Sequence, residues 1–310
     1  MNEDSNLKPP TGTGTALSGA RLVTSAGMWD YWEMTKPRLT FLVLVTTFVG
    51  YCVGSQDGMD WIQLVHTIVG TALVAGGAAV LNQFVERDLD ARMKRTEDRP
   101  MPAGRIQPKE GLIYGILLSV AGGIYLFLIV DWLPAFLSIA SWASYLFVYT
   151  PLKTRTPLCT IIGAVPGAIP PMIGWTAATH SLGAGAWVLF AILFLWQMPH
   201  FYALSHMYQE DYSRGGFPML SVCGPHGDRT SLEIKGYTLA LIPVSLLPAF
   251  LGMNTLVYLI GAILLSVAFL VFGWKAATLR NVDSSRRLFF ASIFYLPFLL
   301  TLMVATKGSL

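Results

Sequence analysis

Long apolar runs separated by short polar segments occupy most of the chain. A transmembrane helix needs about 20 mostly apolar residues, because the hydrocarbon core of a bilayer is about 30 Å thick. Nine runs meet this requirement, so the pattern predicts an all-α membrane protein, a polytopic bundle of about nine transmembrane helices. The runs cover residues 39–55, 61–81, 111–130, 133–150, 157–176, 186–204, 236–253, 255–274 and 288–306.

The fifth run contains three prolines, Pro166, Pro170 and Pro171. Proline lacks a backbone donor and its ring clashes with the preceding helical turn, so we expect this span to be kinked or broken. Irregular backbone of this kind is tolerated at membrane depth where it packs on protein or lines a cavity.

The composition agrees with this pattern and excludes other classes of protein. Hydrophobic residues make up 54% of the chain and charged residues only 13%, whereas a soluble domain is about 25% charged. The three cysteines lie far apart and form no CxxC pair, which argues against a disulfide scaffold. The net charge of +3 comes without a nucleic-acid-binding motif, so we expect no nucleic-acid partner.

Residues 1–28 differ from the rest of the chain. They are polar, rich in Gly, Ser and Thr, and lack the apolar core of a signal peptide. This composition predicts a disordered cytoplasmic tail, so that residues 29–310 form the intramembrane domain. Trp29 and Trp32 then mark the membrane interface ahead of the first span.

The distribution of lysines and arginines predicts the orientation in the lipid bilayer. If the N-terminus lies in the cytoplasm, nine spans place all but one of the 21 basic residues on that side, Lys307 being the exception. This is the bias that the positive-inside rule describes. We therefore expect a multi-pass protein of the cell (inner) membrane, with the N-terminus and the two long loops, 82–110 and 205–235, in the cytoplasm.

The first long loop opens with three oxygen-bearing side chains at helical spacing. If the second span continues as a helix into the cytoplasm, Asn82, Glu86 and Asp90 follow one another in steps of four and line one stripe, whereas Asp88 points elsewhere. Oxygen ligands spaced in this way suit Mg²⁺, which binds one or two carboxylates together with substrate phosphate. The spacing therefore predicts a Mg²⁺ site.

Five basic residues follow within a few turns of these acids: Arg92, Lys94, Arg95, Arg99 and Arg105. The residues predicted to contact the diphosphate are Arg87, which lies among the acids, Lys94, Arg95 and Arg99. Acids that hold a cation, beside bases that hold phosphate oxygens, are the pattern expected of a diphosphate site. The alternative interpretation is a charged helix extension that serves only topology, since basic cytoplasmic loops are common.

The second long loop and the helix before it carry the other candidate residues. His206 and Glu210 are four apart and share a helix face, and Gly215 and Gly216 end that helix. His200 lies six residues before His206, so the two diverge by about 120° on a straight helix and are not expected to bind one metal together. The candidates are Glu210 and Asp211 for catalysis and His200, Tyr202, His206 and Arg214 for substrate binding.

At these two loops the sequence resembles the UbiA superfamily of intramembrane prenyltransferases. The segment NQFVERDLDARMKRTEDRPMPAGR, residues 82–105, looks like that superfamily's Asn-x3-Asp/Glu-x3-Asp signature and the Arg-Pro run after it. The segment PHFYALSHMYQEDYSRGGFPML, residues 199–220, looks like the heme-directed branch, because quinone-directed relatives commonly carry Asp-x3-Asp there. The resemblance covers nearly the whole chain.

The resemblance implies transfer of the farnesyl group of farnesyl diphosphate to the 2-vinyl group of protoheme IX (heme B), giving heme O. Heme B would be a substrate rather than a cofactor. Mg²⁺ on the Asn82, Glu86 and Asp90 stripe would bind the diphosphate, and the basic residues of the first loop would stabilise its departure. Imidazole is a common axial ligand of heme iron, so His200 and His206 are both candidates for the iron contact. The position of His200 just after Pro199 at the membrane boundary favours His200. His206, which shares a face with Glu210, would then orient the substrate or relay a proton.

Two other functions stay open at this point. A UbiA-type prenyltransferase could act on a quinone or chlorophyll precursor, and the His-bearing second segment is the feature that separates the two acceptors. A transporter is the alternative from another class, disfavoured by the scarcity of acidic residues within the spans and the lack of a clear inverted repeat. If heme O is the product, a heme A synthase or cytochrome oxidase assembly proteins are the candidate recipients.

Overall fold

A computed structural model describes residues 27–55, 58–210 and 228–308. Within these ranges nine helices are long and apolar enough to span a membrane, which confirms the predicted all-α bundle. In chain order the helices are α1 (Met28–Met34), α2 (Pro37–Gly54), α3 (Trp61–Asp90), α4 (Pro108–Tyr125), α5 (Trp132–Ala143), α6 (Thr150–Leu152), α7 (Cys159–Ala168), α8 (Pro170–Thr179), α9 (Ala184–Met207), α12 (Asp228–Phe250), α13 (Leu256–Leu279) and α14 (Val282–Ala305).

Two spans contain a stretch of π-helix. α4 continues as η1 (Leu126–Val130), and α5 continues through η2 (Ser144–Tyr149) into α6. The fifth span is broken as the prolines predict, because α7 ends at Ala168 and α8 begins at Pro170. π-helical turns are rare and are often found at functional sites, and η2 ends beside the polar cluster described below.

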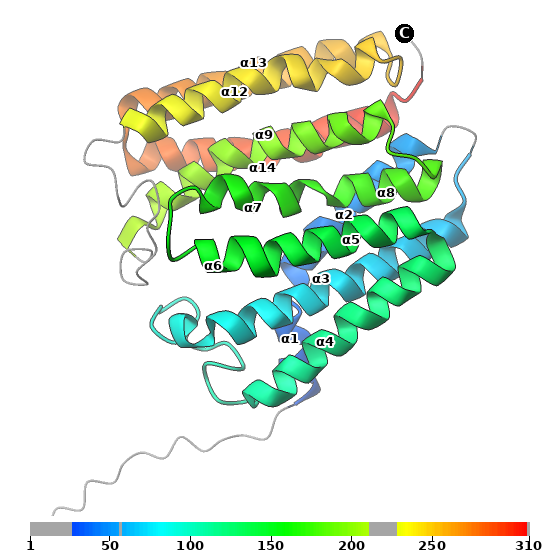
Figure 1. The fold of residues 1–310 in the computed structure, drawn as a ribbon. Helices are drawn as coiled ribbons and strands as arrows, with labels where there is room; N and C mark the ends of the chain where they lie inside the picture. The colour runs from blue at the N-terminus through cyan, green and yellow to red at the C-terminus, as the bar shows by residue number, and fades with distance from the viewer. Residues whose placement is uncertain (1–26, 56–57, 211–227, 309–310) are drawn as a thin grey trace, which may run out of the picture.

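The helices lie roughly parallel or antiparallel to one another, with α12 and α13 on one side of the bundle and α3 and α4 on the other (Figure 1). α3 packs on α4, α2 on α8, and α9 on both α12 and α14. α2 also contacts α14, so the first and last spans meet. The largest cluster of buried apolar side chains joins α7, α8, α9 and the last three helices.

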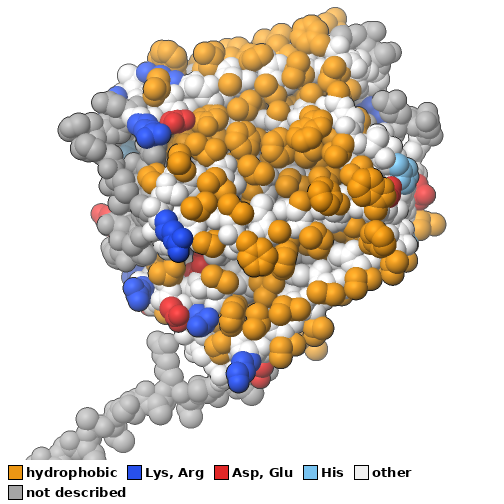
Figure 2. All heavy atoms as spheres, viewed as in Figure 1, with side chains coloured by type: hydrophobic (Ala, Val, Ile, Leu, Met, Phe, Trp, Pro, Cys, Tyr) orange, Lys and Arg blue, Asp and Glu red, His pale blue; other side chains and the backbone are white. Residues whose placement is uncertain are grey.

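An apolar band covers the face of the bundle that Figure 2 shows, between charged side chains at its two ends. Large exposed side chains such as Phe41, Phe127, Phe136 and Phe294 belong to it, each more than half exposed. A continuous apolar surface of this extent is stable in lipid rather than in water. It therefore supports a membrane-embedded protein.

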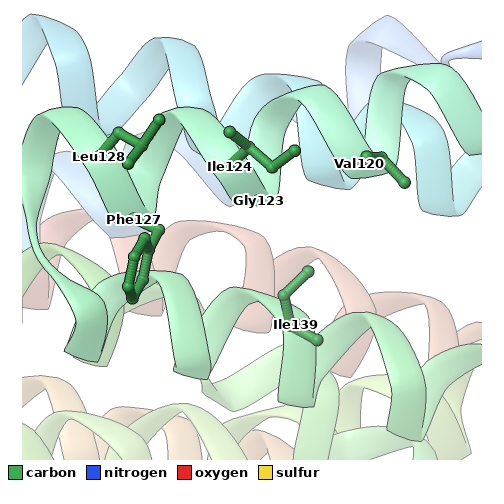
Figure 3. Close-up of a pocket in the computed structure, with 6 residues that line it drawn as sticks. All are labelled: Val120, Gly123, Ile124, Phe127, Leu128 and Ile139. Carbon is green, nitrogen blue, oxygen red and sulfur yellow. The ribbon is translucent and has the colours of Figure 1, made fainter.

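A shallow groove of about 350 Å³ opens in this lateral surface, between α4 with η1 and α5 (Figure 3). It is lined by Val120, Gly123, Ile124, Phe127, Leu128 and Ile139, none of which carries a polar side chain. Without a charged or hydrogen-bonding group, this groove cannot activate a diphosphate, and the chemistry has to be sought at the polar end of α3.

Two glycines allow α2 and α8 to pack closely. A Cβ atom built on Gly174 would overlap the carbonyl oxygen of Thr47, and one built on Gly50 would overlap the carbonyl oxygen of Pro171. Small residues let helix backbones approach within a membrane, where van der Waals packing rather than the hydrophobic effect drives association. This contact fixes the first span, and thus Lys36 at its start, against the broken fifth span.

Candidate active site

The last turns of α3 carry the three side chains that the sequence predicts to share one stripe. α3 runs to Asp90, well beyond the apolar part of the span. Asn82, Glu86 and Asp90 are buried there, with 1%, 5% and 1% exposure. Buried carboxylates are costly unless they are paired and hydrogen-bonded, so each should have a partner.

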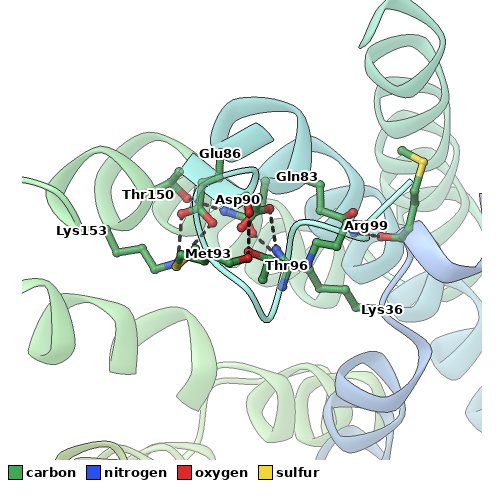
Figure 4. A network of polar contacts seen from close by, with 11 residues as sticks. Lys36, Gln83, Glu86, Asp90, Met93, Thr96, Arg99, Thr150 and Lys153 are labelled. Carbon is green, nitrogen blue, oxygen red and sulfur yellow. Dashed lines mark hydrogen bonds and ion pairs between the residues drawn. The ribbon is translucent and has the colours of Figure 1, made fainter. Parts of the chain in front are cut away.

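Each of the three side chains is paired with a cationic group from another segment (Figure 4). The Lys36 ammonium donates to Asn82 Oδ1 at 2.8 Å. Lys153 Nζ lies 2.9 Å and 3.2 Å from the two carboxylate oxygens of Glu86. Arg99 Nη1 donates to Asp90 Oδ2 at 2.6 Å. The stripe and its three cations form the polar cluster of this site.

Arg99 reaches Asp90 from the loop that follows α3. Thr96 is buried, and its hydroxyl donates to the carbonyl oxygen of Asp90 at 2.8 Å, which turns the chain back over the end of the helix. The backbone N–H of Arg99 then donates to the Thr96 carbonyl oxygen. The loop is therefore folded against the carboxylate stripe by its own hydrogen bonds.

Lys36 occupies an unusual position between α1 and α2. Its backbone is left-handed, with φ 49°, a conformation that few residues other than glycine adopt and that the following Pro37 also disfavours. Burial and the nearby Arg99 guanidinium lower the pKa of the Lys36 ammonium to about 7. Strained backbone of this kind tends to persist at functional sites, and here it directs the ammonium toward Asn82.

The π-helix η2 and α6 supply the other wall of the cluster. Asn82 Nδ2 donates to the Thr150 hydroxyl at 3.3 Å, and that hydroxyl donates to the Tyr145 carbonyl oxygen at 2.8 Å. The rings of Tyr145 and Tyr149 stack with their centroids 5.5 Å apart. Lys153 lies over the Tyr149 ring, so its ammonium is held between an aromatic face and Glu86.

Sequence reasoning missed Lys36 and Lys153 as members of the site. The segment Met34-Thr-Lys36-Pro37-Arg38 also fits the UbiA superfamily, but neither lysine stands at helical spacing with the stripe. Each pairs with a residue far away in the chain. Of the four basic residues predicted in the first loop, Arg99 joins the cluster. Arg87 instead donates to the Phe84 carbonyl oxygen and lies near the exposed Asp88, and Lys94 and Arg95 are exposed.

The residues present fit a Mg²⁺ ion by their donor chemistry. Two carboxylates and the Asn82 amide oxygen match the one or two carboxylates that Mg²⁺ takes beside substrate phosphate. Gln83, next to Asn82, has a buried oxygen, Oε1, without a hydrogen-bond partner in the described part of the chain, while its Nε2 donates to the Met34 carbonyl oxygen. Within the described ranges no three His, Cys, Asp or Glu side chains form a metal site by themselves, so a phosphate would have to complete the coordination.

The two histidines of α9 both face α14. Nδ1 of His200 lies 2.7 Å from the Ser292 hydroxyl, and Nδ1 of His206 lies 2.8 Å from the Ser285 hydroxyl. The two serines are seven residues apart and therefore lie on one face of their helix. His200 and His206 are expected to point about 120° apart on a straight α9. Both nevertheless pair with serines of α14.

The tautomer of His200 follows from the Ser292 hydroxyl. That hydroxyl donates its single hydrogen to the Phe289 carbonyl oxygen at 2.6 Å, so toward His200 it can only accept. This arrangement favours the tautomer with the proton on Nδ1 of His200, in which Nε2 carries the lone pair that a metal could bind. The imidazole is also stacked between Trp196 and Phe289, at centroid distances of 5.1 Å and 4.8 Å.

The other predicted residues of this region lie elsewhere or outside the described ranges. Tyr202 is buried, and its ring centroid lies 6.4 Å from that of Tyr237 in α12. Glu210 is exposed beyond the end of α9. Asp211 and Arg214 fall in residues 211–227, outside the part of the chain that the structure describes. Residues 1–26, most of the predicted tail, also lie outside it.

Curated relatives align with almost the entire chain. It is 46% identical over 292 residues to a protoheme IX farnesyltransferase from Solibacter usitatus, covering 91% of this chain and 100% of that protein. It is 42% identical over 280 residues to the protein of the same name from Salinibacter ruber, covering 89% and 98%. Identity at this level over whole chains reflects common descent.

Solved structures share the fold at much lower identity. A digeranylgeranylglyceryl phosphate synthase superposes with a TM-score of 0.78 at 15% identity, over 90% of this chain and 97% of that one. A UbiA homologue from Archaeoglobus fulgidus bound to GPP and Mg²⁺ superposes with a TM-score of 0.62 at 12% identity, over 88% and 99%. Residues 43–296 also match the UbiA prenyltransferase family. With its nine spans and its buried carboxylate stripe, this chain belongs to the UbiA prenyltransferase family.

Proposed function

We propose that this prenyltransferase transfers the farnesyl group of farnesyl diphosphate to the 2-vinyl group of protoheme IX, giving heme O. The relatives that share 38–46% of its residues are named for this reaction. The observation that carries the proposal is the buried cluster at the end of α3, where three cations surround two carboxylates. Such a cluster suits a diphosphate at the boundary between water and an apolar bundle.

The charge of the cluster supports diphosphate binding. When all five groups are ionised, Lys36, Lys153 and Arg99 exceed the charge of Glu86 and Asp90 by one positive charge. Because the pKa of Lys36 is about 7, an anionic ligand beside it would favour its protonated form. The Mg²⁺ complex of an organic diphosphate is negative, so it compensates that excess. Each cation now bound to the stripe would turn to phosphate oxygens, which form strong charge-assisted hydrogen bonds with guanidinium and ammonium groups.

Mg²⁺ would be held by Asn82, Glu86 and Asp90, and it would supply positive charge to the diphosphate as the bond to the farnesyl group breaks. Arg99 and Lys153 add their own charge to the leaving group from two opposite segments. Stabilising charge that develops in the transition state is the largest contribution that fixed polar groups make to catalysis.

The group transfer balances without an oxidant or reductant. The bond between C1 of the farnesyl group and oxygen breaks, and the diphosphate leaves with the electron pair. The π electrons of the heme vinyl group form a new carbon–carbon bond to C1, and the positive charge moves to the carbon next to the porphyrin. Water adds to that carbon and loses a proton, which gives the hydroxyl group of heme O.

His200 is the favoured iron contact on the acceptor side. Its Nε2 lone pair suits heme iron, for which imidazole is a common axial ligand. Trp196 and Phe289 stack on its ring and hold its plane fixed. His206 would orient the heme or relay a proton, Tyr202 and Arg214 would contact the substrate, and Glu210 and Asp211 would complete the site from the second loop.

The cellular setting follows from the same assignment. We place the protein in the cell (inner) membrane, with the N-terminus and the α3 end of the bundle in the cytoplasm, because basic side chains gather there (Figure 2). Farnesyl diphosphate would then enter from the cytoplasm. A heme A synthase or cytochrome oxidase assembly proteins would receive the product.

The test uses the purified protein in lipid nanodiscs with farnesyl diphosphate, Mg²⁺ and hemin under reducing conditions, with the products read by mass spectrometry. Formation of heme O that requires both farnesyl diphosphate and Mg²⁺ is the expected result. A parallel reaction offers a hydroxybenzoate or a chlorophyllide as acceptor in place of hemin. Prenylation of one of these acceptors, with none of hemin, would overturn the acceptor assignment and leave the diphosphate site in place.

A further inference from the structure

Arg105, at the end of the loop that follows α3, ties this loop to α1. Its Nε donates to Asp30 Oδ1 at 2.7 Å, and its Nη2 lies 3.2 Å from Glu33 Oε2. Its Nη1 donates to the Asp98 carbonyl oxygen at 2.9 Å. All three guanidinium nitrogens are therefore engaged, and they connect segments more than 70 residues apart in sequence.

A polar contact and an apolar contact both hold Arg105 and its neighbour against α1. The backbone N–H of Gly27 and the Arg105 guanidinium hold the pKa of Asp30 below its usual value, so this carboxyl is ionised at neutral pH. Ile106, the next residue after Arg105, is fully buried in one apolar cluster with Met34 of α1. A planar guanidinium with several fixed donors restrains its partners more strongly than a lysine ammonium does.

The two segments joined by Arg105 each deliver one cation to the polar cluster. The loop carries Arg99, which directly follows the residue whose carbonyl oxygen Arg105 holds. α1 ends at Met34, whose carbonyl oxygen accepts from Gln83, and Lys36 follows two residues later. Arg105 itself contacts none of the three stripe residues.

We infer that Arg105 is a positioning residue for the diphosphate site. By holding α1 and the loop together, it sets Arg99 against Asp90 and Lys36 against Asn82. The inference rests on the proposed function only in taking a prenyl diphosphate as the substrate, and it does not depend on which acceptor is prenylated.

The test compares Arg105→Gln with the unaltered protein in two measurements that do not involve the acceptor. Hydrogen exchange should become faster in residues 91–107. The affinity for farnesyl diphosphate with Mg²⁺, measured by calorimetry, should fall roughly tenfold, as expected when binding groups lose their fixed positions. Lys109→Gln, an exposed lysine at the start of α4, should change neither quantity, and Arg105→Lys should give an intermediate effect.

A double variant tests the route of action. If Arg105 acts through Arg99, Arg105→Gln should add little to the loss of affinity that Arg99→Gln causes alone. Full additivity, or faster exchange with unchanged affinity, would overturn the inference. If Arg105→Gln does not fold, Asp30→Asn weakens the same connection from α1 and should show the same two effects on a smaller scale. Normal exchange together with normal affinity in Arg105→Gln would likewise overturn the inference. If the unaltered protein bound farnesyl diphosphate but formed no heme O, that result would count against the proposed function instead.

Discussion

The Lys153 ammonium binds both carboxylate oxygens of Glu86, although 67 residues separate the two side chains. This pair joins the end of the fourth span to the end of the second. Because the side chains of Glu86 and Lys153 are 6% and 18% exposed, water screens the pair only in part. Two spans are thus held in register at the point where the diphosphate would bind.

Lys153→Met should therefore weaken both the site and the fold. The variant leaves the Glu86 carboxylate, whose side chain is 6% exposed, without its lysine partner. Breaking a buried ion pair by removing one partner costs about 3–5 kcal/mol. We expect turnover to fall about 10²-fold and the melting temperature to drop. Arg155→Gln, two residues away and exposed, is the matched control. Kinetics with varied farnesyl diphosphate would contradict the role of Lys153 if kcat and KM both stayed at the level of the control.

The contrast between the stripe and its partners shows what sequence could and could not predict. The nine spans and the broken fifth helix follow from apolar runs and prolines, and both are confirmed. The burial of Asn82, Glu86 and Asp90 on one face follows from their steps of four along one helix. These patterns are local, so the chain itself displays them.

The cations that complete the cluster depend on tertiary packing. Lys36 meets Asn82 only because α2 packs beside α3 and because its backbone is left-handed. Lys153 meets Glu86 only because η2 brings α6 to the end of α3. The sequence pattern does not indicate either pairing, because a basic residue next to a span can set topology or bind a substrate without any difference in the local sequence.

Removing charge from the stripe should reduce activity sharply. Asp90→Asn and Glu86→Gln keep the side-chain volume but remove the negative charge that Mg²⁺ requires, and each should lower turnover on the order of 10²-fold or more. Asp88→Asn is the control, because its side chain is 77% exposed and lies off the stripe. Initial rates at limiting Mg²⁺ provide the measurement. Turnover of Asp90→Asn equal to that of Asp88→Asn would refute the assignment of Asp90 to the metal.

The close contact between α2 and α8 leads to a prediction about stability. Gly174→Ala places a methyl group where the Thr47 carbonyl oxygen already lies, and forcing extra volume into a packed contact costs about 1–3 kcal/mol. We expect a lower melting temperature in detergent. Gly236→Ala is the matched control, because its added Cβ meets no atom within 4 Å. Equal melting temperatures for the two variants would argue against the observed contact.

The proposed orientation can be measured with cysteine reporters in a background in which Cys52, Cys159 and Cys223 are replaced. Glu97→Cys, in the exposed part of the loop after α3, should react with a membrane-impermeant maleimide only from the cytoplasmic side. Ser181→Cys, between α8 and α9 at the other end of the bundle, should react only from outside. Labelling of both positions from one side would rule out the topology.

The acceptor side can be tested through the spectrum of bound heme. The Ser292 hydroxyl favours the His200 proton on Nδ1 and leaves the Nε2 lone pair for iron. Among the described residues, no second hydrogen bond of the Ser285 hydroxyl favours one tautomer of His206. Hemin bound to the unaltered protein should show a Soret shift typical of imidazole ligation. His200→Ala should abolish that shift, while farnesyl diphosphate still binds with normal affinity.

Ser292→Ala extends this test to the tautomer itself, because it removes the acceptor for the Nδ1 proton and leaves the imidazole in place. We expect weaker hemin binding and a partial loss of the Soret shift, with His206→Ala causing a smaller change than His200→Ala. If the double variant His200→Ala, His206→Ala bound hemin with an unchanged spectrum and still made heme O, neither histidine would be the iron ligand. The prenyltransferase assignment would survive that result, because it rests on the stripe of α3 and on the relatives, and the heme would then have to be held by other groups.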